Sequence, residues 1–98
     1  MITIYKYPLE VKDEQEIDIH MVDNGGTLFR LSQQVLSVDA QNDIPCLWAI
    51  VDTDMPKRNR KIIIRGTGHD CSDIRHDVDY LGSFQLYSGA FVGHVFGR

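Results

Sequence analysis

The sequence feature that constrains this fold most is an Asn42-Asp43 pair between two apolar segments. Both residue types tolerate positive φ, which the two central residues of a tight β-hairpin require. Residues 35–41 and 44–52 are therefore predicted to be paired antiparallel strands. Within the second strand, residues 46–51 (CLWAIV) are apolar on both faces. Such a run is typical of a strand that protein covers on both sides, so it is predicted to lie in the core.

Other segments have the β-branched and aromatic content, or the two-residue period, of strands. They are residues 2–7, 16–21, 27–31, 60–65, 80–87 and 90–96. Pro8 ends the first of them and places it near a sheet edge, because proline donates no ladder hydrogen bond. The predicted fold class is mostly β: a single small antiparallel sandwich or partly open barrel of about seven strands, with at most one short helix, in one domain over residues 1–98.

Residues 27–41 follow a turn at residues 23–26 (DNGG) and support two interpretations. We favour a strand at 27–31, a polar interruption at 32–34 and a second strand at 35–41. The alternative is a short helix across 29–35, because leucines and valine recur there with helical spacing.

The length and the 43% hydrophobic content fit one globular domain. No apolar run is long enough to cross a membrane, and the N-terminus lacks a signal-peptide pattern. The protein is therefore expected to stay in the cytosol. The net charge of −4 argues against general nucleic-acid binding, which depends on cations that neutralise phosphates.

Charge is nevertheless unevenly distributed. Residues 10–23 are strongly acidic, whereas residues 57–65 carry five cations and no acid. Lys57, Arg58 and Arg60 are candidate contacts for a phosphate or for an acidic protein surface. The alternative is an ordinary solvated loop.

Arg65, Gly66, Thr67, Gly68 and His69 form a glycine-containing segment after a predicted strand. Glycines let backbone N–H groups approach an anion, and Arg65 and His69 would add positive charge. The segment lacks a Walker lysine and a clear helix behind it, so an ordinary turn is the alternative.

Aromatic residues are the remaining binding candidates. Tyr5 and Tyr7 share one face of a predicted edge strand, so they are expected at an interface, whereas Trp48 and Cys46 are expected in the core. Cys71 and its neighbouring histidines match no metal-ligand spacing and no nucleophile–base pattern. No catalytic residue, metal or cofactor is therefore predicted, and the chain is not expected to be an enzyme.

Five sequence blocks resemble a family of small proteins encoded by tailed bacteriophages. They are residues 4–9 (IYKYPL), the hairpin from 35 to 52 that contains PCLWAIVD, residues 66–69 (GTGH), residues 80–85 (YLGSFQ) and residues 94–96 (HVF). The resemblance spans nearly the whole chain. Residues 22–34 depart from it, because they are longer than the short glycine-containing turn of the family.

This resemblance implies a phage protein that acts in the host bacterial cytoplasm, and it carries over no catalytic residue. Small phage accessory proteins commonly act by binding, which is an argument from class. The first hypothesis is a binding protein that counters a host antiviral defence by binding a defence protein. The alternatives are a sponge for a small nucleotide-like signalling ligand, held at a homo-oligomer interface, and a structural role in virion assembly.

Overall fold

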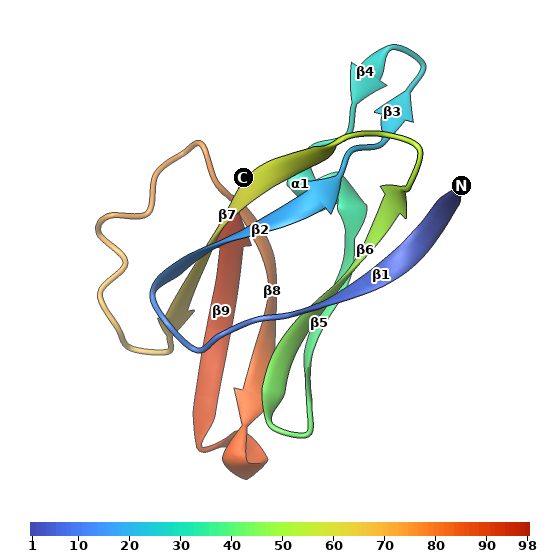
Figure 1. Cartoon of the computed structure of the whole chain (residues 1–98). Helices are drawn as coiled ribbons and strands as arrows, with labels where there is room; N and C mark the ends of the chain where they lie inside the picture. Colours follow the sequence, from blue (N-terminus) through green and yellow to red (C-terminus); the bar gives the residue numbers. More distant parts are fainter.

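The computed structural model describes all 98 residues, and its strands form two antiparallel sheets and a small ribbon (Figure 1). One sheet has the strand order β1-β6-β5, the other has the order β2-β7-β9-β8, and β3 pairs with β4 in the ribbon. The elements are β1 (Ile2–Pro8), β2 (Glu14–His20), β3 (Asp23–Asn24), β4 (Thr27–Leu28), α1 (Leu31–Gln34), β5 (Val35–Gln41), β6 (Ile44–Asp52), β7 (Lys57–Gly66), β8 (Asp79–Leu86), a 3-10 turn (Tyr87–Gly89) and β9 (Phe91–Gly97). Seven strands have seven or more residues, which confirms the predicted mostly β fold class.

The two sheets pack face to face around one core. Leu47 and Ala49 of β6 and Ile62 of β7 are completely buried between them. On one side of the sandwich β5 packs beside β8, so the sheets approach each other there. On the other side β1 and β2 each pair with one neighbour only, so they are the free edges of their sheets.

The predicted hairpin turn is confirmed. Asn42 and Asp43 have φ values of 54° and 58°, and Gln41 pairs with Ile44 across the turn. Two consecutive residues with positive φ match the right-handed twist of the flanking strands. The turn therefore fixes the register of β5 on β6, as the sequence predicts.

The predicted strand at 27–31 is largely wrong, and the short-helix alternative is confirmed in part. β4 ends at Leu28, and α1 occupies Leu31–Gln34. Leu31 and Gln34 are both buried. Residues three apart share one face of a helix, whereas in a strand they point to opposite faces. The helical turn therefore buries both side chains at once.

The prediction that residues 46–51 are covered on both faces is also wrong for one face. Leu47, Ala49 and Val51 point toward the other sheet and are completely buried. On the outer face Cys46 is buried, as predicted, but Trp48 is only partly buried and lies outside the core cluster. The sequence shows that both faces of this strand are apolar, but it does not show whether a second layer of protein covers each face.

Residues 67–78 form an irregular loop between β7 and β8, on the left of Figure 1. The loop contains a hydrogen-bonded turn in which the Ile74 N–H donates to the Cys71 carbonyl at 3.0 Å. Cys71 is exposed and Cys46 is buried, and both are free thiols. No helix of the fold has the length and apolar content that crossing a membrane requires.

Candidate functional site

The basic residues of β7 are divided between its two faces. Arg58 and Arg60 lie opposite the inward-facing isoleucines of β2, so they are on the inner face of the strand. Lys57 and Arg65 are on the outer face. Of these four lysine and arginine candidates, the structure therefore places only Arg58 and Arg60 side by side on the inner face.

Arg60 is the most unusual of these residues because its cation is buried. The residue is only 3% exposed and forms no ion pair with any carboxylate. Its Nη2 donates to Gln34 Oε1 at 2.9 Å and to the Phe29 carbonyl at 3.4 Å, while its buried Nε has no partner. Burial, together with repulsion from Arg58, lowers the pKa of Arg60. A buried guanidinium normally has an anionic partner, so this environment is incomplete.

Arg60 lines a small pocket of about 200 Å³ between α1, β7 and the C-terminus, which lie side by side in Figure 1. We call it the arginine pocket. Its walls are Leu28, Phe29, Arg30, Leu31, Arg58, Arg60, Asp77, Asp79 and Arg98. Asp79 pairs with Arg30 and Asp77 pairs with Arg98, so Arg58 and Arg60 are the two unpaired cations. Four arginines and two aspartates give the pocket a net charge of +2.

A wider groove of about 820 Å³ adjoins the arginine pocket. The two share Arg58, Asp77 and Arg98. Its other walls are polar: Glu14, Gln15, Glu16, Asn59 and Lys61. Acidic and basic residues are balanced in this groove, so the excess positive charge is confined to the arginine pocket.

Arg65 lies on the outer face of β7, but its side chain is buried and hydrogen-bonded to neighbouring segments. Its Nη1 donates to the carbonyls of Asp13 and Ile64, both at 3.0 Å, and its Nη2 donates to Asp73 Oδ2 at 2.7 Å. These bonds tie the loop of residues 67–78 to β7 and to the segment before β2. Arg65 therefore fastens the loop onto the sandwich.

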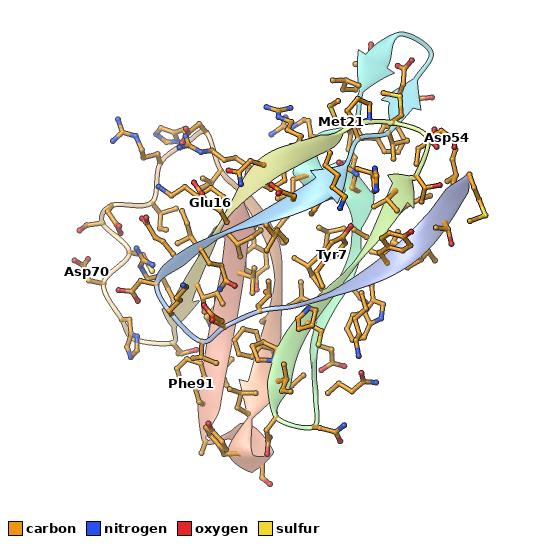
Figure 2. The ribbon with its side chains drawn as sticks, in the orientation of Figure 1. Tyr7, Glu16, Met21, Asp54, Asp70 and Phe91 are labelled. Carbon is orange, nitrogen blue, oxygen red and sulfur yellow. The ribbon has the colours of Figure 1, made fainter.

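Replacing Asp73 by alanine is expected to raise the rate at which trypsin cleaves native protein after Arg75 by about fivefold. Loss of the ion pair with Arg65 removes roughly 1 kcal/mol from the stability of the closed loop, since the pair is partly exposed. Asp70→Ala is the matched control, because Asp70 bonds only within the loop, to Ser72, and points outward in Figure 2. Equal cleavage rates for the two variants would contradict the fastening role of Arg65.

The Gly66–His69 segment forms a tight turn in which the His69 side chain covers Gly66, while the space beside Gly68 is open. The His69 N–H donates to the Gly66 carbonyl at 3.0 Å. A Cβ added at Gly66 would lie 2.8 Å from the His69 ring, so the imidazole covers this glycine. Thr67 Oγ1 lies 2.7 Å from His94 Nε2, which ties the turn to β9. Arg65 and His69 also line a shallow depression of about 320 Å³ with three aspartates, a charge pattern that disfavours anions.

Tyr5 and Tyr7 lie on the inner face of β1, opposite Ala49 and Leu47. The ring centroids of Tyr5 and Tyr7 are 6.4 Å apart, and those of Tyr5 and His20 are also 6.4 Å apart, with the two ring planes at 69°. Tyr7 is partly buried, and burial raises the pKa of its hydroxyl. The tyrosines therefore face the open side of the sandwich, away from the outer surface of β1.

That outer surface is the feature that sequence reasoning missed. Opposite the buried face of β6, the β1-β6-β5 sheet presents large aliphatic side chains to solvent. A β-bulge at Leu36 turns this residue outward as well. We call this surface the outer apolar face; its members are Ile2, Ile4, Leu36, Ile44, Trp48 and Ile50. Ile2, Ile4, Leu36 and Ile44 are 58%, 55%, 54% and 50% exposed. The sequence feature that could have indicated this surface is that both faces of residues 46–51 are apolar.

A family model described as a domain of unknown function (DUF7352) matches residues 1–98 of the chain. The chain belongs to the DUF7352 family. No curated protein and no solved structure matches this DUF7352 domain. The family match therefore extends over both candidate regions, the arginine pocket and the outer apolar face.

Proposed function

We propose that this DUF7352 domain is a phage-encoded, non-catalytic binding protein that acts in the host bacterial cytoplasm. It counters an antiviral defence by docking its outer apolar face on a folded defence protein of the host. The observation that carries the proposal is the cluster of half-exposed aliphatic side chains on one face of one sheet. The resemblance to tailed-phage proteins supports the biological setting.

The largest contiguous apolar patch on a typical monomer covers roughly 300–600 Å² and often marks an interaction site. The whole outer face of three strands about 4.8 Å apart, each with seven residues of about 3.3 Å, covers roughly 330 Å², and the apolar side chains occupy part of it. Permanent homodimers need far more, roughly 1,000 Å² or more from each subunit. The area fits the apolar centre of a standard interface, in which a polar rim completes about 800 Å².

The surroundings of the outer apolar face have the character of such a rim. Lys6, Asp39 and Gln41 border the apolar side chains and are exposed. The Lys6 ammonium donates to the Gln41 side-chain carbonyl at 2.6 Å across the sheet. The partner is therefore expected to present an apolar patch surrounded by polar groups.

Ile4→Lys is expected to abolish binding to the host partner while the domain stays folded. A lysine at the centre of an apolar interface would lose its hydration, which costs enough to weaken binding at least about a hundredfold. The measurement compares host proteins that co-purify with the wild type and the variant, together with the plating efficiency of a defence-sensitive phage. Circular dichroism verifies that the variant is folded.

Val11→Lys is the matched control, because Val11 is an aliphatic residue of similar exposure, 52%, outside the outer apolar face. A host protein retained by the wild type and Val11→Lys but lost with Ile4→Lys supports the proposal. If Ile4→Lys and Val11→Lys behave alike, the face is not the binding surface. If Ile4→Lys instead splits a wild-type dimer, a second copy occupies the face and the proposal fails.

A further inference from the structure

We propose that the arginine pocket binds the phosphate group of a small organic phosphate of the nucleotide class, with the rest of the ligand in the adjoining groove. The arginine pocket lies on the inner side of β7, and the adjoining groove is lined in part by outer-face residues of β2 and β7. Both lie away from the outer apolar face, which belongs to the other sheet. The phosphate site is therefore independent of the proposed protein-binding function, and either can fail alone.

The first argument is the incomplete environment of Arg60. Its guanidinium is buried, its Nε has no partner and no carboxylate pairs with it. A buried cation without a counter-charge is costly, and ionisable groups in such unfavourable environments cluster at functional sites. An oxyanion in the pocket would supply the missing negative charge.

The second argument is the number and placement of free cations. Arg58 lies two residues from Arg60 on the same face of β7, so their Cα atoms are about 7 Å apart. Neither forms an ion pair, whereas Arg30 and Arg98 are already paired. The net charge of +2 matches a phosphate monoester, which carries close to −2 at neutral pH. Planar guanidinium groups suit the bidentate binding of phosphate oxygens.

The third argument is the shape of the site. A volume of about 200 Å³ holds a phosphate group but little more, and Leu28, Phe29 and Leu31 give it an apolar wall. The groove of about 820 Å³ that opens from it is large enough for a sugar and a base. Glu14 and Glu16 in that groove offer acceptors for sugar hydroxyls. An inorganic anion would leave this groove unused.

The test is thermal unfolding of the full chain with adenosine 5′-monophosphate, adenosine or inorganic phosphate, at constant ionic strength. Saturating adenosine monophosphate is expected to raise Tm by about 5 °C. Adenosine alone should give no shift, because it lacks the phosphate. A shift with inorganic phosphate, smaller than that with the nucleotide, also supports the site and shows how much the groove adds. No shift with either phosphate compound, or an equal shift with adenosine, would overturn the proposal.

Arg58→Gln identifies the pocket as the binding site. Arg58 is exposed and forms no ion pair, so its loss should leave the fold intact while affinity falls at least about tenfold. Lys57→Gln is the matched control, since it removes the same charge from the next residue on the opposite face of β7. Equal loss of affinity in the two variants would indicate a general charge effect and would overturn the site.

Discussion

Replacing Gly93 by alanine is expected to lower the free energy of unfolding by about 3 kcal/mol. Gly93 on β9 lies directly opposite Phe84 on β8, and the Phe84 ring covers it. A Cβ at Gly93 would lie 2.3 Å from Phe84 Cζ and 2.7 Å from Cε1. Phe84 is 2% exposed and belongs to the core, so its ring has no free space to move into. Urea denaturation of the wild type and the variant measures the loss.

The double variant Gly93→Ala/Phe84→Leu provides the control. A leucine at position 84 removes the ring atoms that the new methyl group would meet, at a cost of its own of about 1 kcal/mol. In that background Gly93→Ala should cost less than about 1 kcal/mol. Additive costs for the two substitutions would show that the ring and the glycine are not in the contact described.

Replacing Gln34 by leucine is expected to destabilise the fold by a similar amount, about 3 kcal/mol, through lost hydrogen bonds. The buried Gln34 amide nitrogen donates to the carbonyls of His20 and Ile50, at 2.9 and 3.1 Å. Its oxygen accepts from Arg60 Nη2 at 2.9 Å. This one side chain therefore joins β2, β6 and β7, and so links the two sheets. Leucine of similar size would leave two carbonyls and a cation without these partners.

The comparison variants are Ser32→Leu and Gln34→Leu/Arg60→Met, again measured by urea denaturation. Ser32 is exposed on the same short helix, so leucine there should change stability by less than about 0.5 kcal/mol. In the double variant no cation is left without its acceptor, so the combined loss should be smaller than the sum of the single losses. A loss with Gln34→Leu no greater than that with Ser32→Leu would contradict the linking role of Gln34.

The candidate site could be predicted from the sequence only where its residues are neighbours in one strand. Arg58 and Arg60 are both sequence candidates, but the predicted strand begins at residue 60; β7 begins at Lys57, and only this longer strand places the two arginines on one face. The Gly66–His69 segment is a second binding candidate from the sequence, but Gly66 lies six positions after Arg60 on the same strand, which is a distance of about 20 Å. The pocket instead takes its other walls from residues 28–31, 77–79 and 98, which pairing and packing bring to Arg60.

The sequence by itself determined several elements of this protein: the Asn42-Asp43 turn, the strands on each side of it and the edge strand that ends at Pro8. These depend on φ preferences and on the two-residue period, which are properties of neighbouring residues. Only the tertiary structure decided that one apolar face of β6 is covered and the other is exposed, and that Arg60 is buried beside Gln34. Both outcomes depend on which distant strand packs against which face, and local alternation carries no information about that.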